Sequence, residues 1–297
     1  MSAPALLADR VRSFASLVKL SHSVFALPFA LLSLLAATAG KPPIDTLLLV
    51  TAAVVAARTA AMAYNRHADR EQDRANPRTA AREIPRGVVS PREALLLTVA
   101  AGALFLLFCW LLSPMCLWLG VPTLGWLLAY SHVKRFSFLC HLWLGVALGL
   151  SPLAAWFAVD GHFGTRLWAP FVLGCGVAAW VAGFDVLYAC QDEIFDRERG
   201  LHSIPARFGA RRAMWCSRAL YIAAVSAFAA FGVLVPLGKG FQVGVGLALA
   251  LLVWQHRLLR PDDLSRIRMA FFTANGAIAI VMLLAGCLDL YVLPFLH

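Results

Sequence analysis

Long apolar runs separated by short polar segments make up most of this chain. A helix needs about 20 largely apolar residues to cross a bilayer, and runs of that kind recur along the whole length. They predict nine membrane-spanning helices, at residues 22–39, 46–64, 94–112, 115–130, 141–159, 168–190, 219–237, 241–256 and 270–293. The expected fold class is all-α, a polytopic membrane protein whose helices form one bundle, in a single domain over residues 1–297.

The composition supports a membrane protein. Hydrophobic residues make up 61% of the 297 residues and charged residues only 14%, whereas soluble proteins are about 45–50% apolar and about 25% charged. This excludes an ordinary cytosolic enzyme, a disordered chain and a disulfide scaffold. The 7 cysteines lie in or beside apolar runs without a C-x-x-C pair, which indicates small core residues and neither disulfides nor metal ligands.

The basic residues predict the orientation in the membrane. With nine spans, 22 of the 26 lysines and arginines fall on the face that carries the N-terminus. Loops rich in lysine and arginine stay in the cytoplasm, so we expect a multi-pass protein of the inner (cytoplasmic) membrane with its N-terminus inside. The net charge of +10 is then an orientation signal and does not indicate nucleic-acid binding. The basic start and small-residue end of the first run resemble a signal peptide, but eight further spans favour an uncleaved helix.

A first acidic cluster directly follows the second apolar run. Asn65, Asp69 and Asp73 are spaced four apart, so they share one face if the helix continues past the apolar run. Oxygen ligands at this spacing suit Mg²⁺, which takes one or two carboxylates and completes its shell with water and phosphate oxygens.

A second cluster ends the sixth run. Asp185, Tyr188, Asp192 and Asp196 are spaced three, four and four, again on one helical face. Asp185 falls inside the apolar run, where a carboxylate is costly and marks a functional candidate. Ordinary solvated charges paired with nearby arginines would explain one such cluster. Two clusters at span ends on the same predicted face favour a site for Mg²⁺ and a diphosphate.

Basic residues near these clusters are candidates for holding the remaining diphosphate oxygens. Lys134 and Arg135 follow the fourth run, and Arg82 and Arg86 follow the first cluster. The alternative for Lys134 and Arg135 is topology signalling alone, and charge does not separate the two. Arg58 lies within the second run and requires an anion there, either a carboxylate such as that of Asp185 or a group of a substrate.

Three motifs carry a family resemblance. They are Asn65-Arg66-x-x-Asp69-x-x-x-Asp73 with the following Asn76-Pro77-Arg78-Thr79, Tyr130-x-x-x-Lys134-Arg135, and Asp185-x-x-Tyr188-x-x-x-Asp192-x-x-x-Asp196 with the following Gly200-Leu201-x-Ser203. In this order and spacing they resemble the UbiA superfamily of intramembrane aromatic prenyltransferases. The motif residues are most similar to those of the 4-hydroxybenzoate polyprenyltransferase branch, in particular its bacterial members assigned to menaquinone synthesis. This chain departs from many members at two places. Asn65-Arg66 stands where Asn-Asp is common, and Arg86 stands where a small residue is frequent.

The resemblance implies a bundle around a central cavity and a Mg²⁺-dependent enzyme. This enzyme would move an isoprenyl chain from a polyprenyl diphosphate to a ring carbon of an aromatic acid, 4-hydroxybenzoate or a naphthoate, in ubiquinone or menaquinone biosynthesis. The implied metal ligands are Asn65, Asp69, Asp73, Asp192 and Asp196. The implied diphosphate ligands are Arg78, Arg82, Lys134 and Arg135. The implied catalytic residues are Asp185, Tyr188 and Asp192, and Lys19 and Arg58 are the candidates for binding the acceptor.

Other functions fit the sequence less well. A membrane transporter with an ion or anion site on the cytoplasmic side is the main alternative, but its charges would be expected at the midplane and with an inverted repeat. A CDP-alcohol phosphotransferase would carry both acidic clusters in one stretch, with a glycine pattern that Asp69 lacks. A scaffold without activity would leave the spacing of the acidic residues unexplained. Neither the acceptor, the chain length nor the oligomeric state follows from the sequence.

Overall fold

The computed structural model describes residues 14–18, 25–161, 164–235 and 237–292. These residues are helical, without any β-strand beyond one isolated bridge between Arg260 and Asp263. They form two compact units, the first with the described residues 14–18 and 52–132 and the second with those within 25–51 and 133–292. The long helix α3 (Ile44–Ala68) contributes to both units.

Unit 1 contains most of α3, the short α4 (Arg70–Ala75), α5 (Pro91–Leu112) and most of α6 (Pro114–Val133). The loop from 76 to 90 is anchored by a buried apolar cluster that joins the end of α3 to the start of α5. The cluster comprises Leu17, Val18, Ala63, Ile84, Val89 and Ala94. Ser90 begins α5 with a capping box, in which its side chain accepts from the backbone of Glu93 and the Glu93 carboxylate accepts from the backbone of Ser90. These contacts fix the loop that follows the first acidic cluster.

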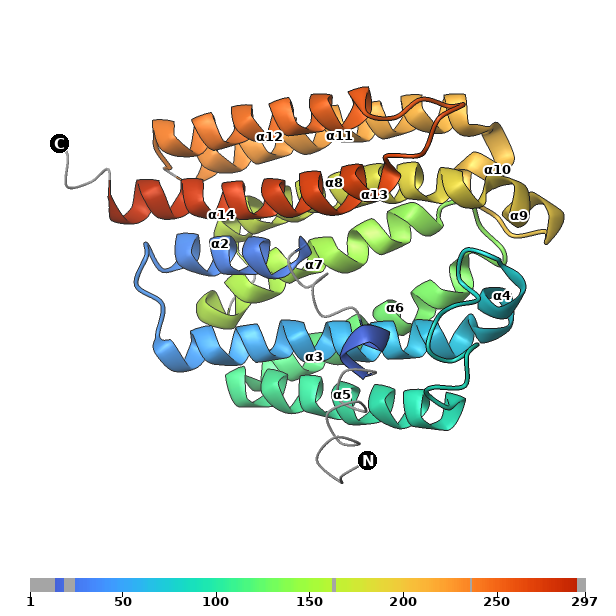
Figure 1. The fold of residues 1–297 in the computed structure, drawn as a ribbon. Coiled ribbons are helices and arrows are strands. Elements are labelled where there is room, and N and C mark those ends of the chain that lie inside the picture. Colours follow the sequence, from blue (N-terminus) through green and yellow to red (C-terminus); the bar gives the residue numbers. More distant parts are fainter. Residues whose placement is uncertain (1–13, 19–24, 162–163, 236, 293–297) are drawn as a thin grey trace, which may run out of the picture. The chain divides into compact units, whose positions relative to one another are not determined.

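Unit 2 is built around α8 (Trp168–Ala189), which packs between α7 (Cys140–Asp160) and α11 (Ala210–Leu234). Helix α12 (Lys239–Arg257) packs against α14 (Asn275–Tyr291) and α11, and α2 (Leu27–Ala37) against α7 and α14. Figure 1 shows α11, α12 and α14 running side by side. Trp180 of α8 is fully buried, and its indole donates a hydrogen bond of 3.1 Å to Asn275.

Glycines allow α7 and α8 to approach closely. Gly145 and Gly149 form a G-x-x-x-G pattern on α7, the spacing that permits close helix contact. A Cβ atom at Gly145 would lie 2.2 Å from the carbonyl oxygen of Ala178, and one at Gly149 would lie 2.5 Å from that of Gly174. No larger residue fits at these two positions unless the helices move apart, so the glycines fix the register of the pair.

The predicted count of nine membrane-spanning helices is not confirmed by the described residues. Six helices are long and apolar enough to cross a membrane: Ile44–Ala68, Pro91–Leu112, Cys140–Asp160, Thr165–Glu198, Ala210–Leu234 and Ala270–Tyr291. The other three predicted ranges contain helices that fall short. Helix α2 has 11 residues. Prolines, glycines and polar residues lower the hydropathy of α6, and Gln242, Gln255 and the basic residues at both ends lower that of α12. The sequence count relied on apolar runs alone, so it did not weigh these polar residues.

Candidate active site

The first acidic cluster follows the end of α3 in unit 1. The helix is interrupted at Asp69, but the backbone N–H of Asp69 still bonds to Asn65 at 2.9 Å, and that of Asp73 bonds to Asp69 at 2.8 Å. These bonds keep the helical spacing of four residues that the sequence predicted. The Asn65 amide donates to a carboxylate oxygen of Asp69 at 2.7 Å and lies 3.4 Å from the Ser131 hydroxyl. Asn65 thus orients Asp69.

Asp73 is the buried member of this cluster and has an open oxygen. Arg82 binds its Oδ1 at 2.6 Å, while the buried Oδ2 has no hydrogen-bond partner in the described part of the chain. The backbone carbonyl of Asp73 accepts from the Thr79 hydroxyl at 3.1 Å, which fixes the loop after α4. A buried carboxylate oxygen without a partner is costly. Its presence fits a position completed by a cation, such as the expected Mg²⁺.

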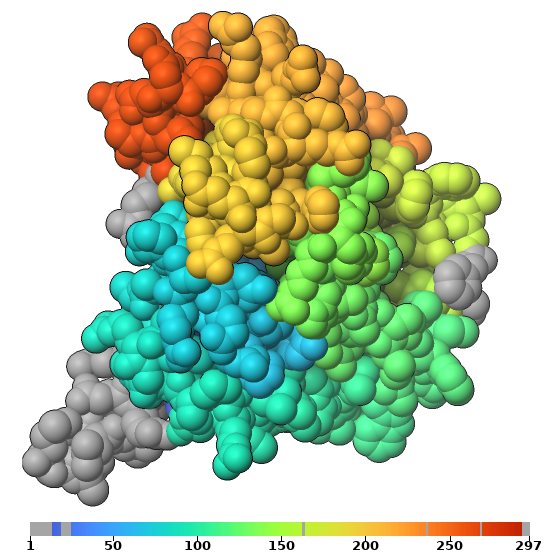
Figure 2. Space-filling view, turned by 90° about the vertical axis from the view of Figure 1, so that its right-hand side faces the viewer, coloured from blue at the N-terminus to red at the C-terminus, as the bar shows by residue number. Residues whose placement is uncertain are grey.

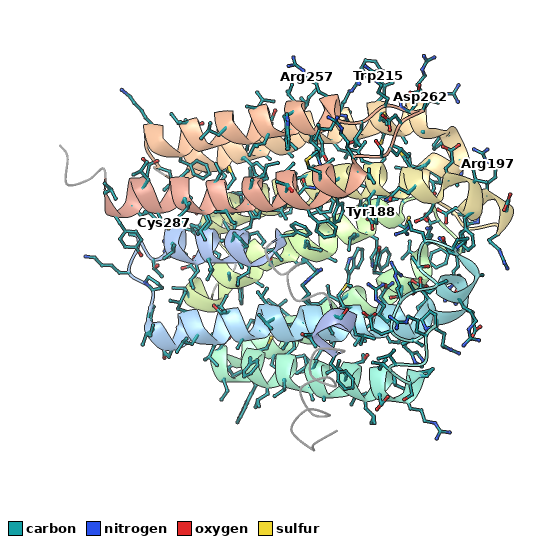
Figure 3. All side chains as sticks on the ribbon, in the orientation of Figure 1. Tyr188, Arg197, Trp215, Arg257, Asp262 and Cys287 are labelled. Carbon is teal, nitrogen blue, oxygen red and sulfur yellow. The ribbon has the colours of Figure 1, made fainter. Side chains whose placement is uncertain are left out.

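The second acidic cluster lies in unit 2, where α8 runs through a tight turn at Cys190–Asp192 into α9 (Glu193–Glu198). The 3₁₀ turn winds the backbone more tightly than an α-helix does. It changes the helical register between Tyr188 and Asp192, so the four residues do not follow one continuous α-helical face as predicted. Asp192 and Asp196 are both buried, and Asp185 is half-buried. Figure 3 labels Tyr188 on α8 and Arg197 on α9, on either side of the turn. Gly200, with a φ of +65°, lies just beyond α9.

Both oxygens of Asp196 are engaged. Lys134 lies 2.8 Å from Oδ1, and the hydroxyl of Ser203 donates to Oδ2 at 3.0 Å. Asp196 and Ser203 are fully buried. Ser203 also caps α10 (Ile204–Phe208) by accepting from the backbone of Ala206 at 3.2 Å. Helices α9 and α10, in yellow and amber, lie on the surface that faces the viewer in Figure 2.

Lys134 is held in its charged form by this cluster. Burial alone would lower the pKa of Lys134, but the hydrogen-bonded carboxylate of Asp196 and the charge of Asp192 raise that pKa above its ordinary value. Its backbone carbonyl also accepts from His202 at 2.7 Å, which ties the segment after α6 to the loop after α9. Lys134 therefore stays an ammonium group beside the second cluster.

Asp185 pairs with a residue that the sequence reasoning missed. The Nδ1 atom of His141, on α7, lies 2.7 Å from Oδ2 of Asp185. His141 is buried, with 2% of its side chain exposed, against 19% for Asp185. The signal in the sequence was a histidine inside an apolar run, seven residues after Lys134 in the second motif. A lone histidine had no visible partner there because α7 and α8 meet only in the tertiary structure.

Arg58 of α3 remains a candidate for binding an anion. Its Nε atom is buried and has no hydrogen-bond partner among the described residues. Arg66 and Tyr130, both of unit 1, lie within electrostatic range. Arg66 is itself buried and lies near the carboxylates of Asp69, Asp73 and Glu83. Arg66, which stands where aspartate is common in the family, thus supplies a positive charge inside the first cluster.

The remaining predicted residues are placed as follows. Arg78 and Arg135 are exposed, and the backbone of Arg78 donates to the Asn76 side chain at 2.9 Å. The ring of Tyr188 packs against Phe271, with centroids 4.4 Å apart. Lys19 lies outside the described residues. All 7 cysteines are free, and four of them are buried as predicted for core residues, whereas Cys175 is exposed and Cys216 and Cys287 are half-buried.

Metal binding is not complete within any one cluster. Among the side chains that the structure describes, no three His, Cys, Asp or Glu residues lie close enough together to hold a metal ion. The first cluster offers the open oxygen of Asp73, while in the second the Asp196 oxygens already bind Lys134 and Ser203. The residues of the first cluster therefore fit Mg²⁺ as part of a larger ligand set.

Comparison with known proteins identifies the family of this chain. A model of the UbiA prenyltransferase family matches residues 26–276, which covers both clusters. A 4-hydroxybenzoate octaprenyltransferase of Aromatoleum aromaticum is 29% identical over 291 residues, which are 95% of this chain and 97% of that protein. The protein of that name from Vibrio cholerae is 31% identical over 277 residues, 90% of this chain and 94% of that protein.

Solved structures show the same fold. The apo structure of a UbiA homologue from Aeropyrum pernix K1 matches with a TM-score of 0.81 and 34% identity, over 90% of this chain and 97% of that one. A UbiA homologue from Archaeoglobus fulgidus bound to DMAPP and Mg²⁺ has a TM-score of 0.72 at 19% identity, over 94% and 99% of the two chains. Because the family match spans most of the sequence and the helices suit a bilayer, this chain belongs to the UbiA prenyltransferase family and is an integral membrane prenyltransferase.

Proposed function

We propose that this prenyltransferase moves a polyprenyl chain from a polyprenyl diphosphate to a ring carbon of a small aromatic acid, in a Mg²⁺-dependent step of quinone biosynthesis. The names of the relatives support 4-hydroxybenzoate as an acceptor. The resemblance of the motif residues to family members assigned to menaquinone synthesis supports a naphthoate. The observation that carries the proposal is that Oδ2 of Asp73 is buried without a described hydrogen-bond partner, while Arg82 binds Oδ1. Asp73 belongs to a cluster that directly follows an apolar helix.

Both acidic clusters are proposed to supply metal ligands. Their residues are Asn65, Asp69 and Asp73 in the first cluster, and Asp192 and Asp196 in the second. When bound, Mg²⁺ neutralises charge on a diphosphate and makes it a better leaving group. The structure of a relative with DMAPP and Mg²⁺ supports this pairing of metal and donor.

Basic side chains are proposed to bind the diphosphate. Arg82 and Lys134 pair with motif carboxylates at 2.6 and 2.8 Å. The exposed Arg78 and Arg135 extend the positive charge of each cluster. Arginine suits phosphate because its planar group donates two parallel hydrogen bonds. These four residues would stabilise the negative charge that develops on the leaving group.

The chemistry then needs little beyond positioning and exclusion of water. The bond between the prenyl carbon and oxygen breaks, and the diphosphate leaves with the electron pair. The allylic cation is attacked by a ring carbon of the acceptor, which forms a carbon–carbon bond, and the ring then loses a proton. Asp185, Asp192 or Tyr188 would accept or relay that proton. The apolar helices would shield the cation from water.

Arg58 and Lys19 are proposed to bind the carboxylate of the acceptor. The buried Nε of Arg58 without a described partner supports this role. Substitution of Arg58 by Gln should raise the acceptor KM about tenfold or more, because a hydrogen bond to a charged group is lost, and leave the donor KM unchanged. If Arg58→Gln instead gave little folded protein, Arg58 would be a structural residue.

The orientation and domain organisation are also part of the proposal. Both units would form one functional domain over residues 1–297, since the family match crosses both. The protein would lie in the inner membrane with its N-terminus and both acidic clusters on the cytoplasmic side, as its basic loops indicate. Cysteine labelling from each side of the membrane would test this orientation.

A reconstituted assay would test the proposed reaction. Purified protein in nanodiscs receives Mg²⁺ and prenyl diphosphates of several lengths. The acceptor is 4-hydroxybenzoate, 1,4-dihydroxy-6-naphthoate or homogentisate, and prenylated products are measured by mass spectrometry. We expect one acid to be prenylated with release of diphosphate, and no product after chelation. Absence of product with all acceptors, together with solute flux in liposomes, would contradict the proposal and favour a transporter.

A further inference from the structure

His141 makes two hydrogen bonds from a buried position on α7. Its Nδ1 lies 2.7 Å from Oδ2 of Asp185, and its Nε2 lies 3.3 Å from the backbone nitrogen of Ile204. A backbone N–H can only donate, so Nε2 must accept this bond and carries no proton. The proton of the neutral ring is then on Nδ1, which donates to Asp185. The contact with Ile204 therefore assigns the tautomer with the proton on Nδ1, which is the one that can donate to Asp185.

Helix packing fixes the position of this histidine. Gly145 and Gly149 lie one and two helical turns beyond His141, on the same face of α7. They contact the backbone carbonyls of Ala178 and Gly174 on α8 so closely that a Cβ atom would clash. Asp185 lies seven residues, about two turns, after Ala178 on α8. The glycine contacts thus set the register that brings His141 and Asp185 together.

The Ile204 contact links Asp185 to the loop that holds the second cluster. Ile204 begins α10, directly after Ser203, whose hydroxyl binds Asp196. The backbone of His202 in the same loop binds the carbonyl of Lys134. His141 therefore joins Asp185 to the segment whose neighbouring residues hold Asp196 and Lys134. No exposed side chain is needed for this connection, since His141, Ser203 and Ile204 are all buried.

We propose that His141 is a positioning residue: its Nδ1–H holds the Asp185 carboxylate in one orientation and ties it to the start of α10. This inference rests on the proposed function in that it takes Asp185 as a group that acts on the substrate. His141 binds Oδ2 of Asp185, so Oδ1 is the oxygen that this proposal assigns to the substrate. A fixed carboxylate acts without first reorienting, which lowers the barrier of the step that it assists.

Three substitutions separate the two bonds of His141. His141→Asn places an amide donor close to the position of Nδ1, so it keeps the bond to Asp185 and loses the acceptor for Ile204. His141→Gln places an amide oxygen close to the position of Nε2, so it keeps the acceptor and loses the donor. His141→Leu removes both and is the matched apolar control.

The proposal predicts that activity and stability respond in different orders. His141→Asn should keep kcat within about threefold of wild type, while His141→Gln and His141→Leu should lose about tenfold or more, the effect expected for a lost hydrogen bond to a charged group. The donor KM should not change. The apparent Tm should instead be higher for His141→Gln than for His141→Leu, because only Gln satisfies the buried N–H of Ile204. Activity that follows Tm, or wild-type kcat in all folded variants, would overturn the positioning role.

A double-mutant comparison tests whether His141 acts through Asp185. In an Asp185→Ala background, His141→Leu should lower kcat no further, because the group it positions is gone. An equal additional loss in that background would show that His141 acts elsewhere and would contradict the proposal.

A spectroscopic measurement is independent of catalysis. With ¹⁵N-labelled histidine, the signal that disappears in His141→Asn should show a protonated Nδ1 and an unprotonated Nε2. A ring protonated on both nitrogens, or on Nε2 alone, would overturn the proposed geometry. If the wild-type protein transferred no prenyl group but showed this tautomer, the proposed function would fail while the His141–Asp185 contact would stand.

Discussion

The two acidic clusters have similar residue spacing but differ in how their carboxylates are satisfied. In unit 1, Asp73 binds Arg82 through one oxygen and leaves the other buried without a described partner. In unit 2, Asp196 uses one oxygen for Lys134 and the other for Ser203. The first cluster is therefore prepared to accept a cation. In the second cluster, Asp196 is already paired with Lys134 and also holds a loop in place through Ser203.

Similar residue spacing therefore does not give the carboxylates of the two clusters the same contribution to stability. Breaking a buried ion pair leaves an uncompensated charge and is strongly destabilising, whereas an open oxygen contributes no contact to lose. Residues of the second cluster should therefore affect folding and catalysis together, and the open side of the first should affect catalysis alone.

The largest expected effect is on turnover. Asp73→Asn and Asp196→Asn should each lower the prenyl transfer rate by about a thousandfold, because each removes a carboxylate proposed to bind the metal and the diphosphate. Asp69→Ala and Asp192→Ala should do the same. The apparent Tm should fall further for Asp196→Asn, whose carboxylate holds both Lys134 and Ser203, than for Asp73→Asn, whose carboxylate holds Arg82 through one oxygen. Near wild-type turnover in either Asn variant would contradict the shared metal site, and equal Tm values would remove the distinction between the clusters.

The next largest effect is on stability when the cation of a pair is removed. Lys134→Met should cost about 1–3 kcal/mol, less than for a fully buried pair because about a third of the Lys134 side chain is exposed. The double variant Lys134→Met/Asp196→Leu should recover part of this loss, since no charge is left unpaired. Denaturation in mixed detergent micelles would measure both. A double variant less stable than Lys134→Met would show that the pair does not determine the stability of this loop.

A smaller effect should come from the metal itself. At a Mg²⁺ concentration about ten times its Kd, binding should stabilise the wild-type protein by about 1.4 kcal/mol. Asp73→Asn should abolish the corresponding rise in Tm. Ca²⁺ serves as a control for general divalent effects, because it prefers longer bonds and more ligands. A full Mg²⁺ shift in Asp73→Asn would show that the open oxygen is not a ligand.

Comparable or smaller effects on stability should come from the hydrogen bonds that neutral side chains donate to the motif carboxylates. Ser203→Ala should lower stability by about 1–2 kcal/mol, because it removes both a bond to Asp196 and the N-cap of α10. Asn65→Ala, its counterpart in the first cluster, should cost about 0.5–1 kcal/mol for the half-buried bond to Asp69. Thermal scans of both variants would test the order, and a larger loss for Asn65→Ala would reverse the comparison.

Much of this organisation followed from sequence patterns. Apolar runs located the helices, and the four-residue spacing predicted that Asn65, Asp69 and Asp73 follow helical periodicity, which their backbone bonds confirm. The count of nine spans was not confirmed, since six of the described helices meet the length and hydropathy that a span requires. An apolar run reports local composition, and it does not show where proline, glutamine or end charges make a helix too polar.

Periodicity and composition are local properties of the chain, and they were enough to predict a helical membrane protein, its family and two oxygen-rich clusters. The pairing of Lys134 with Asp196 and of His141 with Asp185 depends on the folded arrangement of the helices. So does the absence of a described partner for one oxygen of Asp73. The two pairs join residues that lie 62 and 44 positions apart in the chain. They depend on loops and on the register of α7 against α8, where Gly145 and Gly149 let backbone meet backbone. Side-chain partners at such separations are chosen by packing, and no local pattern encodes them.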